Sequence, residues 1–137
     1  MASDATLVDT NVLLDLVTDD PRWFGWSLRA LERAAVRGRL VINDVIYAEL
    51  SVRYERMEAL DDMVTQAGLV LEALPRPALF LAGKAFATYR RRGGRRSGVL
   101  PDFFIGAHAA VARMALLTRD AGRYRGYFPT VEVMAPG

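Results

Sequence analysis

The sequence ATLVDTNVLLDLV, residues 5–17, decides the fold. Its first four residues are apolar or β-branched and stop abruptly at the polar residues 9–11, after which a second apolar run begins. A short apolar run between polar residues indicates a buried strand, whereas the helical spacing within residues 12–17 indicates a helix. Asp9 is therefore predicted where the carboxyl end of a strand meets the start of a helix, which is where open α/β sheets bind ligands.

The rest of the chain continues this alternation of strands and helices. Further strands are predicted at residues 40–42, 69–71, 115–117 and, more weakly, 130–134, with helices at 22–37, 45–53, 57–66, 78–92 and 101–114. Such alternation predicts right-handed crossovers and a mostly parallel sheet of four to five strands with helices on both faces. The length of 137 residues and the hydrophobic content of 52% favour one domain, residues 1–137, with a three-layer α/β/α architecture.

Composition excludes several classes of function. The chain has no cysteine, so disulfides and thiolate chemistry are excluded. No apolar run approaches the roughly 20 residues that span a membrane, and no signal peptide begins the chain, so we expect a soluble cytoplasmic protein. The net charge of +2 says little about partners, but the lysine and arginine residues are all arginines except Lys84. Arginines are most concentrated in the segment 90–96 (RRRGGRR). Arginine suits phosphate contacts, although a GC-rich coding sequence also explains its abundance.

Four acidic residues occupy positions that a solvated surface does not explain. Asp9 and Asp120 each follow a buried strand, where each could cap the next helix. Asp102 begins a helix that is apolar nearly all round, where the helix dipole would stabilise its charge. Gly106, one turn further on, is expected to leave the approach to Asp102 uncrowded. Glu49 lies among apolar helix neighbours, and a carboxylate buried there would either become protonated or recruit a cation.

The partner of Glu49 is either a bound ligand or Arg53, four residues further along the same helix. Strand ends and the following helix starts share one edge of a parallel sheet, so the four acids are expected to converge there. Carboxylates that converge cannot all stay ionised unaided. A hard divalent cation with oxygen ligands, Mg²⁺ or Mn²⁺, would remove their repulsion.

Several motifs together resemble those of PIN domains, and most closely those of the VapC-type toxin ribonucleases of bacterial toxin–antitoxin pairs. They are DTNVLL at 9–14, the helix that carries Glu49, PDFFIGAHA at 101–109 and LLTRD at 116–120. The resemblance implies the strand order 3-2-1-4-5 and a Mg²⁺- or Mn²⁺-dependent endoribonuclease. It places Asp9, Glu49, Asp102 and Asp120 in the acidic tetrad, with Asn11 and Thr118 as accompanying polar residues. Arg119 departs from the small or polar residue that is common at its position, which bears on substrate contacts.

The mechanism implied by the resemblance is metal-assisted hydrolysis of RNA phosphodiesters. Asp9 and Asp102 are expected as direct ligands, and Glu49 and Asp120 as ligands through water or as residues that orient the attacking hydroxide. Arg95 and Arg96, in the loop leading to Asp102, would hold RNA phosphates or form solvated surface. The resemblance also implies a homodimer and a VapB-like antitoxin whose tail enters the acidic cleft. Trp23 and Trp26 would serve those contacts or pack in the core.

Other functions remain open at this point. A housekeeping RNA-processing nuclease and a non-catalytic module that binds RNA or protein would share the same fold.

Two other classes of protein lack the residues that they need. A phosphotransferase of the haloacid dehalogenase type needs a second aspartate where Asn11 stands and a downstream lysine, and the only lysine, Lys84, lies in mid-helix. A receiver domain needs an acidic pair at its first strand and a lysine after its last, and both are missing. His108 falls on a different helix face from Asp102 and is predicted to be a packing residue.

Overall fold

A five-stranded sheet forms the centre of the protein, as described for residues 4–137 by a computed structural model. All neighbouring strands are parallel, and their order is β3-β2-β1-β4-β5. The strands are β1 (Thr6–Val8), β2 (Leu40–Asn43), β3 (Leu69–Glu72), β4 (Ala115–Leu117) and β5 (Val133–Met134). The predicted strand order is confirmed, and the sheet is entirely parallel.

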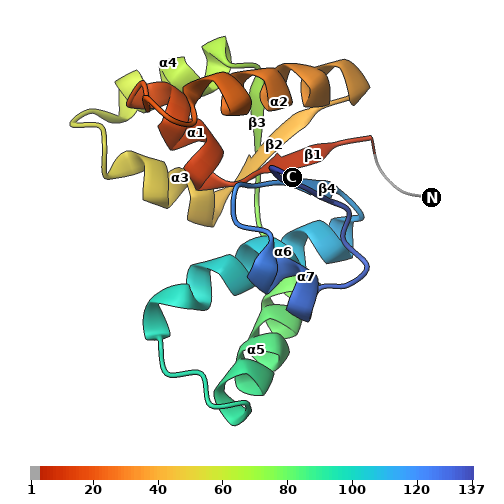
Figure 1. The fold of residues 1–137 in the computed structure, drawn as a ribbon. Coiled ribbons are helices and arrows are strands. Elements are labelled where there is room, and N and C mark those ends of the chain that lie inside the picture. Colours follow the sequence, from red (N-terminus) through yellow and green to blue (C-terminus); the bar gives the residue numbers. More distant parts are fainter. Residues whose placement is uncertain (1–3) are drawn as a thin grey trace.

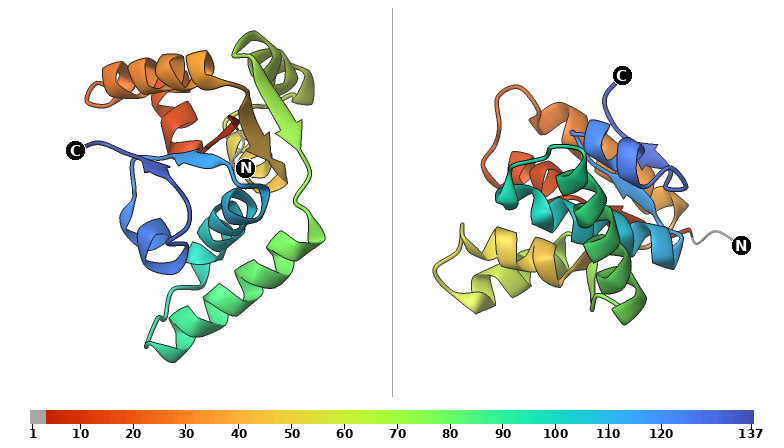
Figure 2. Two further views of the ribbon diagram at one scale, coloured as in Figure 1. Left: turned by 90° about the vertical axis from the view of Figure 1, so that its right-hand side faces the viewer. Right: turned by 90° about the horizontal axis from the view of Figure 1, so that it is seen from below.

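Helices cover both faces of this sheet, which confirms the three-layer architecture (Figures 1 and 2). In Figure 1, α2 and α4 lie above the sheet, α5, α6 and α7 lie below it, and α1 and α3 begin at its carboxyl edge. Among the described residues the helices are α1 (Thr10–Val17), α2 (Phe24–Arg37), α3 (Asp44–Ser51), α4 (Met57–Gln66), α5 (Arg76–Arg91), the 3₁₀ turn η1 (Ser97–Val99), α6 (Leu100–Ala112) and α7 (Gly122–Tyr127). None of them is both long and apolar enough to cross a membrane.

The helix ends differ from the predicted ones for local reasons. Helix α2 begins at Phe24 rather than at Arg22, because the Asp20 carboxylate accepts hydrogen bonds from the backbone N–H groups of Arg22 and Trp23 at 2.9 and 2.8 Å and holds a turn there. Helix α6 ends at Ala112 because Arg113 adopts a left-handed conformation with φ of 57°. The short helix that Asp120 could have capped is α7, but its N-cap residue is Ala121.

The register of the central strands brings two chain segments side by side. Leu7 lies between Val41 of β2 and Leu116 of β4, and all three side chains are fully buried. Val8 pairs with Leu117, the last residue of β4, so the residues that follow β1 and β4 leave the sheet next to each other. This register positions the candidate site.

Candidate active site

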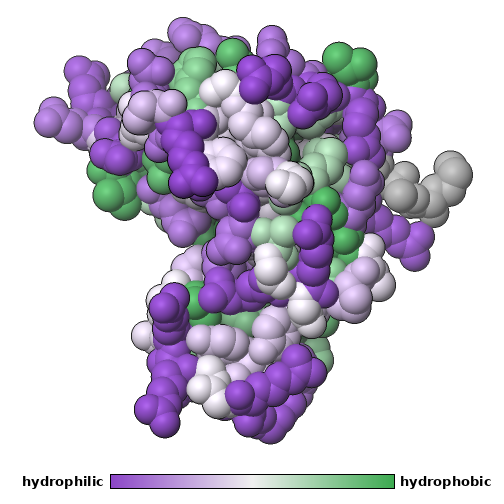
Figure 3. Space-filling view, in the orientation of Figure 1, coloured by the Kyte–Doolittle hydropathy of each residue, from purple (hydrophilic) through white to green (hydrophobic). Residues whose placement is uncertain are grey.

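The carboxyl edge of the sheet carries a pocket of about 450 Å³. All four acids singled out in the sequence line it, together with Arg53 and Tyr124 among other residues: Asp9, Glu49, Asp102 and Asp120. Figure 3 shows the surface hollowed between the part that carries α1 to α4 and the part that carries α5 to α7, with hydrophilic side chains bordering the hollow. The four acids therefore line one pocket, although no three acids in the described part of the chain form a metal-binding group.

Asp9 is both a helix cap and a pocket residue. The residue is 5% exposed. Oδ1 accepts a hydrogen bond from the backbone N–H of Thr10 at 2.7 Å and so caps α1. Oδ2 accepts from Thr118 Oγ1 at 2.8 Å and from the Tyr124 hydroxyl at 3.0 Å. Burial raises the pKa of Asp9 to about 6, the charge of Asp102 adds to the rise, and the hydrogen bonds oppose it.

Asn11 and Thr118 join the ends of β1 and β4. The Asn11 side chain donates to Thr118 Oγ1 at 3.2 Å and accepts from the backbone N–H of Arg119 at 3.1 Å. Thr118 Oγ1 in turn accepts from the backbone N–H of Asp120 at 3.1 Å. The Asp120 side chain is exposed at the edge of the pocket. These two polar residues therefore position Asp9 and Asp120 relative to each other.

Glu49 is half-buried on α3, and its hydrogen-bond partner comes from α1. Oε1 accepts from Thr10 Oγ1 at 2.6 Å. Burial raises the pKa of Glu49, and the charge of Asp102 contributes to the rise. None of the ion pairs within residues 4–137 includes Glu49, so the alternative of a salt bridge with Arg53 is wrong. Arg53 instead lines the same pocket.

Asp102 lies in the first turn of α6 and is held by two residues of α7. Its Oδ2 lies 2.6 Å from Arg123 Nη1, and its Oδ1 accepts from the Tyr124 hydroxyl at 3.4 Å. Burial raises the pKa of Asp102 despite Arg123, which acts in the opposite direction. Burial and the two neighbouring aspartates raise the pKa of Tyr124, so its hydroxyl stays protonated and donates to both.

Gly106 does not serve the approach to Asp102, and that expectation is wrong. A Cβ atom at this position would lie 2.4 Å from ring carbons of Phe128, so the missing side chain makes room for this ring in the core.

His108 is buried, as predicted. Its Nδ1 lies 3.1 Å from the Asn43 side-chain nitrogen, outside the set of residues that line the pocket.

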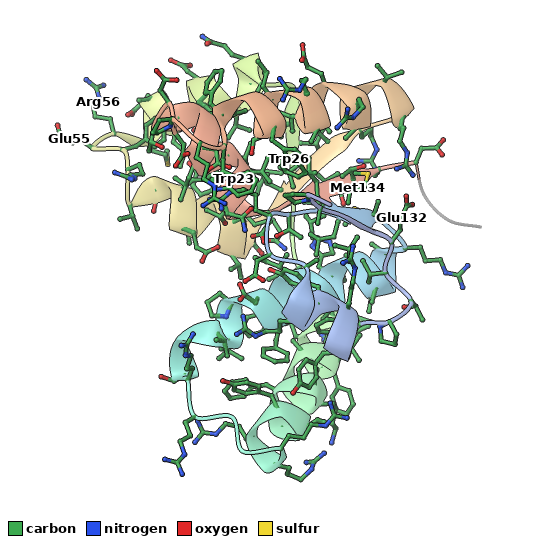
Figure 4. The ribbon with its side chains drawn as sticks, viewed as in Figure 1. Trp23, Trp26, Glu55, Arg56, Glu132 and Met134 are labelled. Carbon is green, nitrogen blue, oxygen red and sulfur yellow. The ribbon has the colours of Figure 1, made fainter. Side chains whose placement is uncertain are left out.

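Arg119, the departure from the family pattern, has an intramolecular partner. Its guanidinium binds Asp15 through two contacts, Nε to Oδ2 at 2.7 Å and Nη2 to Oδ1 at 3.0 Å, and lies 5.0 Å from the Trp23 ring centroid. The Asp15 carboxylate also accepts from Ser27 Oγ at 2.6 Å. Arg119 therefore anchors the loop after β4 to α1. Trp23 and Trp26, labelled in Figure 4, are half-buried and contact each other edge to face.

Four residues of this network were missed in the sequence: Thr10, Asp15, Arg123 and Tyr124. Asp15 did not carry the signal that revealed Glu49, because Val12 is the only apolar residue among its neighbours three and four positions away. The α7 residues carried none, because their short segment has no helical apolar pattern. Arg95 and Arg96 are exposed between α5 and η1 and do not line the pocket, so their contact with RNA stays a prediction.

The donor chemistry of the pocket suits a hard divalent cation, although no ligand set is ready-made. Within residues 4–137, no three acidic or histidine side chains come together as closely as a metal site requires. The pocket nevertheless offers carboxylate oxygens from four residues, the type of ligand that Mg²⁺ and Mn²⁺ prefer. Burial raises the pKa values of Asp9, Glu49 and Asp102, and the charge of a second acid adds a smaller part to each rise. The four pocket acids therefore fit such a cation in chemistry and charge. Arg123 forms an ion pair with one of them, Asp102.

Comparison with known proteins identifies the family. The model of the PIN domain family matches residues 6–128. A comparison with curated proteins finds no match. Among solved structures, the chain is similar to VapBC2 from Rickettsia felis bound to a DNA fragment from its promoter (16% identity, 97% of this chain and 99% of that chain covered, TM-score 0.73).

Two further structures show the same fold. They are VapBC-1 from nontypeable Haemophilus influenzae (17% identity, 96% and 97% covered, TM-score 0.72) and a toxin–antitoxin complex from Klebsiella pneumoniae (23% identity, 96% and 98% covered, TM-score 0.65). At these identities the likeness is one of fold. The family match extends over most of the chain and includes all four pocket acids, and the chain belongs to the PIN domain family.

Proposed function

We propose that this protein is a Mg²⁺- or Mn²⁺-dependent endoribonuclease and the toxin of a VapBC-type toxin–antitoxin pair. The observation that carries the proposal is the convergence of four carboxylates on one pocket at the carboxyl edge of the sheet. Membership of the PIN domain family supports nuclease chemistry. The likeness to VapBC2, VapBC-1 and a further toxin–antitoxin complex supports the toxin assignment.

Asp9 and Asp102 would hold the cation directly, and Glu49 and Asp120 would bind it through water or orient the attacking water. A bound divalent cation lowers the pKa of a coordinated water and stabilises charge on the leaving oxygen. The chain's own residues fix the carboxylates: Tyr124 donates to Asp9 and Asp102, and hydrogen bonds from Thr118 and Thr10 orient Asp9 and Glu49. Fixing these carboxylates before RNA binds removes reorganisation from the reaction.

The proposed partners follow from the same assignment. RNA is the substrate, with Arg95 and Arg96 as candidates for phosphate contacts beside the pocket. A VapB-like antitoxin and a second copy of the chain complete the assembly, which would act in the cytoplasm. A short reading frame immediately upstream that encodes an antitoxin-like protein would favour the toxin over a housekeeping RNA-processing nuclease. The four acids in one pocket argue against a non-catalytic binding module.

The test of this proposal is RNA cleavage by the purified protein. Single-stranded RNA should be cut with Mg²⁺ or Mn²⁺ and left intact in EDTA. Asp9→Asn should abolish cleavage while circular dichroism shows an unchanged fold, whereas Asp62→Asn, at an exposed position on α4, should cleave as the wild type does. Undiminished cleavage in EDTA, or full activity of Asp9→Asn, would refute the proposal.

A further inference from the structure

The ion pair between Arg123 and Asp102 lies at the border of the acidic pocket, which Asp102 lines and Arg123 does not. Arg123 Nη1 is 2.6 Å from Asp102 Oδ2, and the two side chains are 22% and 32% exposed. The neighbouring Tyr124 is buried and donates to Asp9 Oδ2 at 3.0 Å. Tyr124 thus fixes α7 against the pocket, and Arg123 is presented to Asp102 from a defined position.

Arg123 is the cation that the pocket acids engage directly. Of the four acids, only Asp102 takes part in an ion pair within residues 4–137. Arg53 lines the pocket without such a pair. A divalent cation that binds Asp102 would therefore meet the guanidinium at the same carboxylate, and two positive charges at one carboxylate repel each other.

A displaced Arg123 would remain beside the pocket with its donors unpaired. Guanidinium binds carboxylate and phosphate with the same forked geometry, so the partner it leaves and the partner it would gain are chemically equivalent. The phosphate backbone of RNA would approach the pocket that Asp102 and Asp120 border. The Arg123 side chain is partly exposed, so such a phosphate would reach it from solvent.

We propose that Arg123 is an internal counter-ion that a divalent cation displaces from Asp102, and that the released guanidinium then binds a phosphate of RNA. This inference rests on the proposed function. It assigns Arg123 two opposite effects: it weakens binding of the metal to the RNA-free protein, and it strengthens binding of RNA to the metal-loaded protein. A residue with a merely structural role would not affect the two in opposite directions.

The first experiment measures Mn²⁺ affinity by calorimetry without RNA. Arg123→Gln should bind Mn²⁺ about fivefold more tightly than the wild type, the effect of removing a partly exposed competing charge. The control Arg125→Gln, at an exposed position on the same helix, should match the wild type. Unchanged or weaker Mn²⁺ binding by Arg123→Gln would overturn the counter-ion role.

The second experiment measures RNA cleavage at saturating Mn²⁺, so that metal occupancy is equal. Arg123→Gln should raise the KM for single-stranded RNA about fivefold, the loss of one partly screened contact to a phosphate, and Arg125→Gln should not. An unchanged KM would overturn the phosphate contact. A wild type that binds no Mn²⁺ in the calorimeter would refute the proposed function itself. If the wild type binds Mn²⁺ and Arg123→Gln has the same Mn²⁺ affinity and the same KM, this inference alone is refuted.

A third experiment uses the wild-type protein, so its result does not depend on whether the variant folds. The Nη–H NMR signals of Arg123 should exchange faster with solvent when Mg²⁺ saturates the RNA-free protein, because Nη1 loses its contact with Asp102 Oδ2. The Arg119 signal serves as an internal control, since its partner Asp15 lies outside the pocket. An Arg123 signal that Mg²⁺ leaves unaltered would overturn the displacement.

Discussion

Asp9→Asn should make the metal-free protein more stable at neutral pH while it removes activity. In the unfolded chain the carboxyl titrates near 3.8, whereas burial in the fold raises its pKa to about 6. Between these values the folded state binds more protons than the unfolded state, so the free energy of unfolding falls as pH rises. Above about pH 6 the ionised side chain destabilises the fold by about 3 kcal/mol relative to its protonated form.

The net gain from the substitution is smaller than this penalty. The asparagine Oδ1 can still accept from the N–H of Thr10, but its amide group would face the hydroxyls of Thr118 and Tyr124, which now donate to Oδ2. Both hydroxyls would have to rotate, and a lost hydrogen bond of this kind costs about 1 kcal/mol. We expect a gain of about 1–2 kcal/mol at pH 7.5, which raises Tm by roughly 5 °C.

The assay is urea unfolding of both proteins in EDTA, followed by circular dichroism from pH 4 to pH 7.5. The difference in stability between Asp9→Asn and the wild type should grow with pH between about 4 and 6 and level off above. Other ionisable groups at the pocket, Glu49, Asp102 and Arg123, are common to both proteins, so the difference reports Asp9 together with its charge coupling to Asp102. The surface control Asp62→Asn should follow the wild type. A pH-independent difference, or a less stable Asp9→Asn at pH 7.5, would refute the reasoning.

Further predictions concern metal binding, the loop after β4, a helix end and a strand. Saturating Mn²⁺ should raise the Tm of the wild type in a thermal melt, because it binds only the folded state. Arg119→Met leaves Asp15, whose side chain is 3% exposed, without its cation, so urea unfolding should show a loss of about 3 kcal/mol. Arg113→Gly should raise stability by up to about 1 kcal/mol, since glycine adopts the left-handed conformation seen there (φ 57°) without strain. Thr6→Val should stabilise by about 1 kcal/mol, because the buried Thr6 hydroxyl has no hydrogen-bond partner within the described chain.

The sequence by itself determined the strands, most helices and the positions of the four acids. Apolar runs broken by polar residues reveal which segments are buried, and a parallel sheet places every strand end and following helix start along one edge. Asp9 and Asp120 could therefore be assigned to the same edge although they are far apart in the chain. Whether Asp9 caps a helix or faces a pocket could not be decided in this way, and each of its two oxygens takes one role.

Only the tertiary structure decided which partner each charged group receives. Glu49 binds Thr10 rather than Arg53, and Arg119 binds Asp15. Arg123 reaches Asp102 from a six-residue helix whose sequence shows no amphipathic pattern. Local periodicity reports which side of an element is buried, but contacts between segments depend on strand register and on how short helices pack across the edge of the sheet. The acids could be found from their local surroundings, whereas their counter-ions are chosen by the packing of distant segments.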